Sequence, residues 1–332
     1  MKAIHWTNYG PPNVLRVKEV VKPVPKSNEV LIKVHAASVT AGDCELRELI
    51  FPLYLKVPLR LYIGLTKPKR KTILGQDFSS EIESTGNAVS RFKVGDHIFG
   101  TTGFSNGSYA EFICLPEKPR DADGVLAVMP TNMTFEEAAT IPTGGLEALH
   151  FIRKANIQRG QKVLINGAGG SIGTIAVQLA KHNGAEVTAV DSTDKLDMLS
   201  KLGADYVIDY TSEDFTQNKK KYDVIFDVVG KSSFSRCVKA LNKNGYLLIA
   251  NPKPLKMIKG AWVSRTTHKN VYLDTAMQTT ENLLHLKKMI EAGKIKTVID
   301  RCYPMEQIAA AHSYVDSGQK KGNVVILVYK SN

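Results

Sequence analysis

Apolar and polar positions alternate along the first part of the chain. Residues 13–25 (NVLRVKEVVKPVP) and 28–39 (NEVLIKVHAASV) carry apolar side chains at alternating positions, which is the period of a strand with one buried face. Turn signals such as Gly86-Asn87 separate further short runs of this kind. We therefore predict an all-β region, arranged as a small barrel, over residues 1–115.

The period changes at residue 134. Thr134, with Glu137 three residues later, forms the capping-box pattern that is typical of a helix start. Strand-like apolar runs then alternate with helical stretches. A regular succession of strand and helix is typical of βαβ units around a parallel sheet. The sequence therefore predicts an α/β region with a doubly wound parallel sheet.

An apolar, aromatic and basic segment, residues 48–72, interrupts the β region. It contains three prolines, and a proline inside a helix removes one hydrogen bond and clashes with the preceding turn. We therefore expect no continuous amphipathic helix here. The segment is interpreted as a loop or as a lid over an apolar substrate, with a membrane-surface patch as the alternative.

Size and charge narrow the classes of function. The 332 residues suggest two domains, and 43% apolar with 23% charged residues is ordinary for a globular protein. The net charge of +12 is spread over the whole chain. The dense basic runs, 67–71 and 219–221, are not interleaved with aromatic residues, so solubility and attraction of phosphate groups are favoured over nucleic-acid binding.

Three further features bear on location. No run of about 18 apolar residues is present, so we expect no membrane span. The first ten residues lack the apolar core of a signal peptide, which predicts a cytoplasmic protein. The four cysteines, Cys44, Cys114, Cys237 and Cys302, are far apart in the sequence and are interpreted as separate reduced thiols.

The strongest chemical signal is VLINGAGGSIG at residues 163–173. An apolar strand leads into glycines and a helix follows, which is the context of a dinucleotide-binding turn. In the G-x-G-x-x-G register Ala168 replaces the first glycine. We expect the sharp turn there, close approach of a pyrophosphate at Gly170 and close helix packing at Gly173. The residues expected around the pyrophosphate, at the helix N-terminus, are Ala168, Gly169, Gly170, Ser171, Ile172 and Gly173.

The acidic residue that follows this turn leaves the choice of cofactor open. Asp191 ends the next strand, where a carboxylate ordinarily bonds the ribose 2′-hydroxyl of NAD and repels a 2′-phosphate. Ser192, Thr193 and Lys195 follow immediately, and hydroxyls with an ammonium group suit a 2′-phosphate. The pattern favours NADP(H) slightly over NAD(H), and Lys195 is equally compatible with a solvated helix-start lysine.

The whole chain resembles the medium-chain dehydrogenase/reductase superfamily, and within it the zinc-free, zeta-crystallin-like quinone oxidoreductases. The segments that carry the resemblance are YGPPNVLRVKEV (9–20), VLIKVHAASVTAGD (30–43), FKVGDHIFG (92–100), GSYAEF (107–112), IPTGGLEALH (141–150), GAGGSIGTIAVQLAK (167–181), LGADYVIDY (202–210) and GNVVI (322–326).

The resemblance implies two domains and their arrangement. Residues 1–125 and 278–332 would form a GroES-like catalytic barrel, and residues 126–277 a Rossmann domain that binds NAD(P). The active site would lie in the cleft between the domains. A homodimer through an exposed edge strand of the Rossmann sheet would also be typical of such proteins.

The resemblance also implies that this chain lacks catalytic zinc. Zinc-dependent members carry Gly-His-Glu where this chain has Gly75-Gln76-Asp77, and a cysteine where it has Thr40. An amide and a hydroxyl are poor zinc ligands. Gln76 is therefore interpreted as an amide that lines the cleft.

Without zinc, hydrogen-bond donors must polarise the acceptor. The candidate catalytic donors are Thr40, Thr143 and a tyrosine of the 48–72 segment, Tyr54 or Tyr62. Asp43 matches an aspartate of the family and is either structural or catalytic, and each of these residues has a purely structural alternative. The further candidate cofactor contacts are Tyr210, Val229, Gly230, Asn251, Lys321 and Asn323.

The resemblance implies hydride transfer from NAD(P)H to a hydrophobic small-molecule acceptor, either a quinone or an α,β-unsaturated carbonyl compound. Such an acceptor spreads the incoming charge onto an oxygen, so hydrogen-bond donors can replace a metal. Two alternatives stay open: a zinc-free alcohol dehydrogenase or enoyl-thioester reductase, and a cofactor-binding protein without turnover that acts as a scaffold or sensor.

Overall fold

Two units, each with its own β-sheet, make up the structure. The computed structural model describes residues 1–119, 124–250, 254–273, 276 and 278–329. The first unit consists of Met1–Thr143, Gln278–Glu291 and Thr297–Asn332, and the second of Gly144–Met277 and Ala292–Lys296. Among the described residues, no helix has the length and apolar character needed to cross a membrane.

A largely antiparallel sheet of seven strands forms the barrel of the first unit. Six strands follow the order β14-β15-β3-β4-β5-β7, and β6 pairs with β3. Their bounds are β3 Glu29–Ser38, β4 Asp77–Thr85, β5 His97–Thr101, β6 Phe112–Pro116, β7 Val125–Val128, β14 Ile299–Pro304 and β15 Asn323–Leu327. A hairpin of β1 (Lys2–Trp6) and β2 (Leu15–Glu19) stands beside this sheet.

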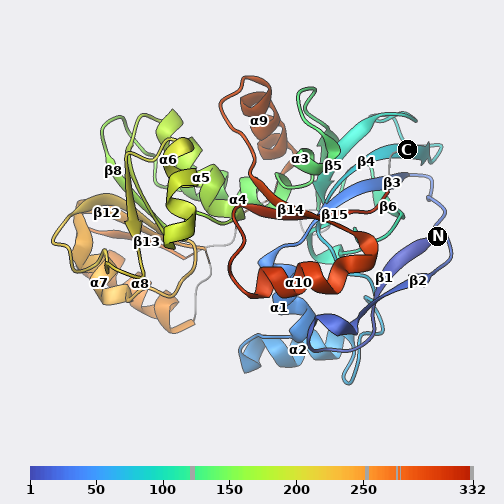
Figure 1. The fold of residues 1–332 in the computed structure, drawn as a ribbon, viewed down its shortest axis with the longest axis horizontal. Coiled ribbons are helices and arrows are strands. Elements are labelled where there is room, and N and C mark those ends of the chain that lie inside the picture. Colours follow the sequence, from blue (N-terminus) through green and yellow to red (C-terminus); the bar gives the residue numbers. More distant parts are fainter. Residues whose placement is uncertain (120–123, 251–253, 274–275, 277, 330–332) are drawn as a thin grey trace. The chain divides into compact units, whose positions relative to one another are not determined.

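The central strand of this sheet is β3, and segments from both ends of the chain meet on it. Most of its ten residues are buried, since β4, β6 and β15 all pair with it. Val325 of β15 lies opposite Ser38 of β3, so the C-terminal segment completes a sheet that the N-terminal segment begins (Figure 1). Trp6, Phe78 and Tyr109 are the bulkiest aromatic residues of the core beneath it.

Helices complete the first unit. They are α1 Ala41–Glu48, α2 Leu53–Ile63, α3 Phe135–Ala138, α9 Thr280–Glu291 and α10 Ile308–Asp316, with 3₁₀ turns η1 Pro12–Val14, η2 Gly103–Ser105 and η4 Met305–Gln307. The expectation that prolines would exclude a helix from the 48–72 segment is wrong, because α2 runs through Pro58. Pro52 stands at its N-cap, where no amide hydrogen is needed. Pro58 is exposed, so the carbonyl it leaves unpaired can bond water.

The second unit is a parallel sheet with strand order β10-β9-β8-β11-β12-β13. The strands are β8 Lys162–Asn166, β9 Glu186–Asp191, β10 Tyr206–Asp209, β11 Tyr222–Asp227, β12 Leu241–Ile249 and β13 Asn270–Tyr272. The helices are α4 Pro142–Lys154, α5 Ser171–His182, α6 Leu196–Lys201, α7 Phe234–Ala240 and α8 Pro254–Thr266, with the 3₁₀ turn η3 Thr193–Lys195. Counted from β8, the order is 3-2-1-4-5-6, that of a Rossmann sheet. The strand orders of the two units agree with the prediction of a β-barrel plus a doubly wound parallel sheet.

Strand order reverses between β8 and β11 in this sheet. Open α/β sheets bind ligands at the carboxyl ends of the strands beside such a reversal. The glycine-rich turn leaves β8 at that end, which makes it the first place to look for a cofactor site.

Candidate functional site

The glycine-rich turn after β8 is shaped by Gly167 and Gly173. Gly167 has φ +82°, a conformation that favours glycine. The expectation that Ala168 makes the sharp turn is therefore wrong by one residue. A Cβ atom on Gly173 would lie 2.3 Å from the carbonyl oxygen of Gly167, so only glycine lets α5 pack this closely against the strand end.

The N-terminus of α5 presents backbone amides with room in front of them. Gly170 is the N-cap, and the first bond of the helix runs from the Thr174 amide to the Gly170 carbonyl. The amides of Ser171 and Ile172 thus precede the hydrogen-bonded ladder of the helix. A Cβ on Gly170 would meet only the Gly167 carbonyl oxygen, at 3.8 Å. The backbone is open to close approach by an anion at this point.

A buried ion pair between Asp191 and Lys195 contacts the glycine-rich turn. Asp191 accepts a hydrogen bond from the Gly169 amide at 2.7 Å and another from the Ser192 amide at 2.9 Å. Lys195 Nζ lies 3.1 Å from its carboxylate, and both side chains are less than a tenth exposed. Lys195 is therefore a buried counter-ion rather than a solvated lysine. Asp191 is committed to the turn and carries no uncompensated charge.

The two hydroxyls beside this pair are also directed at carboxylates. Ser192 Oγ donates to Asp194 at 2.6 Å, and the Thr193 hydroxyl donates to Asp209. The bond from Thr193 and those from Thr211 lower the pKa of Asp209. Asp209 of β10 lies directly opposite Asp191 of β9, a neighbour that no sequence motif indicates.

A second set of contacts braces the turn from β11. Asp227 accepts from the Asn166 amide at 2.8 Å and from the Gly230 backbone amide at 3.0 Å. A Cβ on Gly167 would lie 2.4 Å from a methyl group of Val229. Val229 and Gly230 therefore border the turn, whereas Asn166 and Asp227 are structural neighbours that the sequence reading did not single out.

The remaining candidate cofactor contacts have different surroundings. Tyr210 is exposed and follows β10, with its amide donating to the Asp191 carbonyl. In the first unit, the Asn323 side chain donates to the Val298 carbonyl at 3.0 Å, and the Lys321 amide donates to Asp300 at 2.8 Å. Asn251 lies outside the described residues.

In the first unit, Thr40 and Asp43 form a capping box at the start of α1. Asp43 accepts from the Thr40 amide at 2.9 Å and from its hydroxyl at 2.7 Å, and the Thr40 hydroxyl accepts from the Asp43 amide. Asp43 is fully buried and Thr40 is partly exposed. Burial raises the pKa of Asp43, while the bonds from Thr40 oppose the shift.

A second buried carboxyl holds Thr143. Asp77 accepts from the Thr143 hydroxyl at 2.6 Å and from its amide at 3.1 Å. Ser38 Oγ lies 3.5 Å from the same carboxyl. Burial raises the pKa of Asp77 to about 7, and the bonds from Thr143 oppose the shift. Both candidate threonines thus direct their hydroxyl hydrogens at buried carboxyl groups.

Gln76 differs from these two threonines. Its backbone carbonyl accepts from Thr102, but its side-chain amide, which is partly exposed, makes no hydrogen bond within the described part of the chain. Across residues 1–119, 124–250 and the other described ranges, no group of three or more histidine, cysteine, aspartate or glutamate side chains could hold a metal ion. The site presents an available amide donor next to Asp77.

The sequence of this chain was compared with family models and with curated proteins. Family models of the alcohol dehydrogenase GroES-like domain and of zinc-binding dehydrogenases match residues 26–120 and 202–326. A 2-methylene-furan-3-one reductase of Solanum lycopersicum is 31% identical over 98% of this chain and 79% of the relative. The chain belongs to the medium-chain dehydrogenase/reductase superfamily. Its relatives place it in the quinone oxidoreductase branch, as the sequence predicted.

Two further proteins are similar to this chain over nearly its whole length. The NADPH-dependent alkenal/one oxidoreductase of Arabidopsis thaliana, a chloroplastic protein, is 31% identical over 98% of this chain and 79% of its own. The structure of the quinone oxidoreductase from Coxiella burnetii superposes with a TM-score of 0.86 at 29% identity, over 99% of both chains.

Tyr54 and Tyr62, two further catalytic candidates in this medium-chain reductase, lie on α2 and are about half exposed. The ring of Tyr62 lies beneath the guanidinium of Arg70. Neither tyrosine shares a hydrogen bond with Thr40, Asp43 or Thr143 in the described part of the chain. The structure therefore does not bring them into the threonine–carboxyl network.

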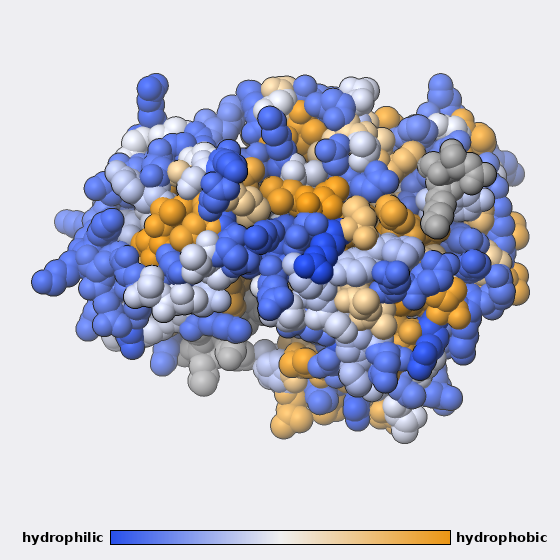
Figure 2. Space-filling view, viewed as in Figure 1, coloured by the Kyte–Doolittle hydropathy of each residue, from blue (hydrophilic) through white to orange (hydrophobic). Residues whose placement is uncertain are grey.

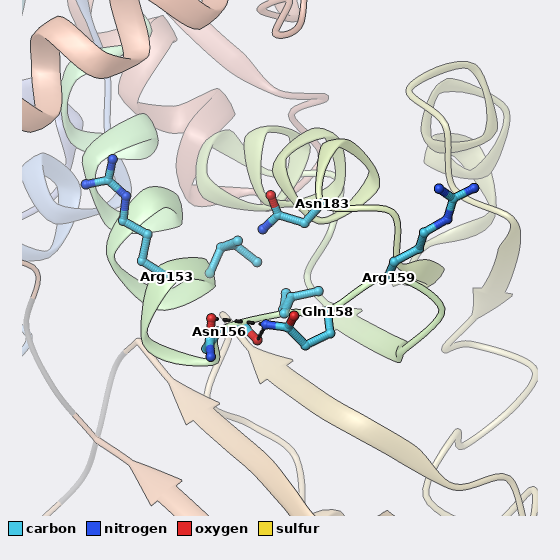
Figure 3. Close-up of a pocket in the computed structure, with 7 residues that line it drawn as sticks. Arg153, Asn156, Gln158, Arg159 and Asn183 are labelled. Atoms are coloured by element: carbon cyan, nitrogen blue, oxygen red, sulfur yellow. Dashed lines mark hydrogen bonds between the residues drawn. The ribbon is translucent and has the colours of Figure 1, made fainter.

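A shallow pocket of about 330 Å³ lies elsewhere in the second unit, where α4 and α5 end. Figure 3 shows Arg153 and Arg159 extending away from each other, while the Gln158 amide bonds Asn156. The hydrogen-bond donors that line this pocket do not converge on one point. The pocket adjoins the beginning of β8, whereas the glycine turn follows its end.

Proposed function

We propose that this protein is an NAD(P)H-dependent oxidoreductase that transfers hydride to a quinone or an α,β-unsaturated carbonyl compound. The observation that carries the proposal is the open N-terminus of α5 at the reversal point of a Rossmann sheet. Relatives that match nearly the whole chain are named for reduction of alkenals, enones and quinones.

The residues present fit a dinucleotide. Gly170 leaves space where a pyrophosphate would lie, and the amides that open α5 supply donors and the positive end of the helix dipole. The nicotinamide, when bound, supplies the hydride. The stretch Ala168–Gly173 would hold the pyrophosphate, with Tyr210, Val229 and Gly230 beside the nucleosides and Lys321 and Asn323 as further contacts.

We propose a preference for NADP(H), which rests on the Asp191–Lys195 pair. An uncompensated carboxylate repels a 2′-phosphate, but here Asp191 is neutralised by Lys195 and bonded to the turn. Ser192 and Thr193 would then exchange their bonds to Asp194 and Asp209 for bonds to the phosphate. The name of the Arabidopsis relative, which includes NADPH, supports the same preference.

We propose that the Gln76 amide stabilises the developing charge on the acceptor. Hydride addition to a conjugated acceptor places negative charge on an oxygen, which needs a donor. The hydroxyl groups of Thr40 and Thr143 donate to Asp43 and Asp77. They are therefore not available to the acceptor, and their role would be to hold the residues that line the site. We also propose that the reaction needs no zinc, because an amide at Gln76 and a hydroxyl at Thr40 are poor zinc ligands.

Two further features belong to this proposal. The edge strand β13 ends the parallel sheet and could pair with a second copy, giving a homodimer. The four cysteines are all free thiols, which suits a reducing compartment such as the cytoplasm.

Turnover with a panel of quinones and enones tests the proposal. We expect oxidation of NADPH with reduction of at least one acceptor, and no dependence on added zinc or on a chelator. Gln76→Leu should lower kcat about a hundredfold while leaving the Kd for NADPH unchanged. Binding of NADPH without turnover on any acceptor would instead identify a cofactor-binding protein, and stoichiometric zinc in the active protein would refute the zinc-independent mechanism.

A further inference from the structure

Helix α2 presents an apolar face to solvent. Leu53, Val57 and Leu61 follow one another at intervals of four residues and are 77%, 54% and 66% exposed. Tyr54 and Tyr62 form the neighbouring row and are 53% and 51% exposed. A helix on the surface of a globular protein normally has the reverse arrangement, with its polar side outward.

The opposite side of α2 explains how the helix is held. Ile63 is buried in the core and Leu59 packs against the same cluster. The Arg60 guanidinium lies 5.2 Å from the Tyr9 ring centroid, and the Tyr9 hydroxyl donates to the Gly64 carbonyl at 2.7 Å. Because these contacts fix the helix, its outer face stays exposed.

The exposed face continues beyond the helix. Ile50 before it and Leu65 after it are each 63% exposed. Figure 2 shows apolar side chains gathered at the lower edge of the view, where Figure 1 places α2. Apolar patches of this kind on soluble chains mark surfaces that bind a partner.

The charged residues in the stretch of chain that forms this face are of one sign. Between Leu49 and Gln76 there is no aspartate or glutamate. The basic residues of the same stretch are Lys56, Arg60, Lys67, Lys69, Arg70 and Lys71. Arg70 and Lys71 lie 5.5 and 5.8 Å from the ring centroid of Tyr62, so the basic loop borders the apolar face.

We propose that α2 and the loop 64–71 form a docking surface for an anionic lipid bilayer. Leucine, valine and tyrosine side chains would enter the boundary between headgroups and acyl chains, while the lysines and arginines face anionic headgroups. Tyrosines suit that boundary because they have an apolar ring and a polar hydroxyl. The absence of carboxylates from this stretch favours lipid over a protein surface, which would present charges of both signs. This inference does not depend on turnover.

Vesicle co-sedimentation of the full chain tests the proposal. We expect binding to phosphatidylcholine vesicles that contain about 30% phosphatidylserine, weak binding to phosphatidylcholine alone, and loss of binding as NaCl rises from about 0.1 to about 0.5 M.

Matched variants assign the binding to this surface. Leu53→Ser/Leu61→Ser should weaken it at least about tenfold, whereas Val21→Ser/Val24→Ser, at two exposed valines outside α2, should leave it unchanged. Lys67→Glu/Lys69→Glu/Arg70→Glu should also weaken it at least about tenfold. Lys219→Glu/Lys220→Glu/Lys221→Glu, which changes the net charge equally, should have a much smaller effect.

Three outcomes would overturn the inference. The first is no binding to anionic vesicles, and the second is equal weakening by the α2 variants and their controls. The third is conversion of a dimer to a monomer by Leu53→Ser/Leu61→Ser in sedimentation velocity, which would show that the face meets a second copy. Thermal unfolding of each variant ensures that the comparison uses folded protein.

Discussion

The glycine turn of the second unit and the threonine–carboxyl network of the first unit solve opposite problems. The turn removes side chains, so that backbone amides face open space at Gly170. The network buries two carboxyl groups, Asp43 and Asp77, and gives each a threonine hydroxyl. The first arrangement is ready for an anion from outside, whereas in the second each threonine hydroxyl already donates to a buried carboxyl group. The comparison shows that buried carboxyl groups can hold a wall of the protein in place, whereas exposed backbone amides are suited to binding a ligand.

The largest expected effect concerns the ion pair that supports the turn. Lys195→Met keeps the apolar stem against Gly169 but leaves Asp191 buried without a counter-ion. We expect a loss of about 3–5 kcal/mol in the free energy of unfolding, measured by urea denaturation, and weaker NADPH binding. Asp191→Asn/Lys195→Met should recover most of the stability because no charge remains buried. If Lys195→Met unfolds like the wild type, the pair does not support the turn.

The openness of the turn can be tested without disturbing the fold. Gly170 has φ −93°, which alanine adopts, and its Cβ would have room. Gly170→Ala should therefore retain the unfolding temperature but raise the Kd for NADPH about a hundredfold, through loss of about two charge-assisted hydrogen bonds. Gly173→Ala is the contrasting variant, since its Cβ would meet backbone. It should lower the unfolding temperature and also weaken NADPH binding. Unchanged NADPH affinity in Gly170→Ala would remove the turn from the cofactor site.

The pH dependence of stability tests the other side of the comparison, the buried carboxyl group of Asp77. Asp77 has a pKa of about 7 in the folded chain against 3.8 for its ordinary value. Between about pH 4 and 7 the folded state therefore holds a proton that the unfolded state has lost. The contribution of this group to stability is present at low pH and falls as pH rises, by about 1.4 kcal/mol per pH unit.

Asp77→Asn isolates this effect. The difference in the free energy of unfolding between wild type and variant should fall with rising pH over that range and become flat above about pH 7, as measured by urea denaturation at several pH values. A difference that is independent of pH would mean that Asp77 has the same pKa in the folded and unfolded chain. The carboxyl group would then be ionised in the folded chain over this pH range.

The fold and the cofactor turn were readable from sequence because both depend on local patterns. Strand and helix periods predicted the α/β region, and the glycines after β8 predicted the turn. The error at Ala168 arose because a motif fixes spacing but not backbone angles, and Gly167 with φ +82° makes the bend.

The network of the first unit was only partly readable. Thr40 and Asp43 are three residues apart, so their capping box is local. The bond between Asp77 and Thr143 joins residues 66 positions apart, and no spacing rule predicts it. The helix through Pro58 was missed because a general rule about proline was overridden by contacts from Leu59 and Ile63 to the core.

The pairing of β15 with β3 has a consequence for how the chain is made. During synthesis β3 emerges early, but its neighbour β15 follows only after the whole second unit. Until then the end of β3 at residues 36–38 has no partner on the edge that β6 pairs further along, and an open strand edge recruits other strands. Domains of a growing chain usually fold in order from the N-terminus. In this protein the second unit can complete its sheet first, and the first unit closes last.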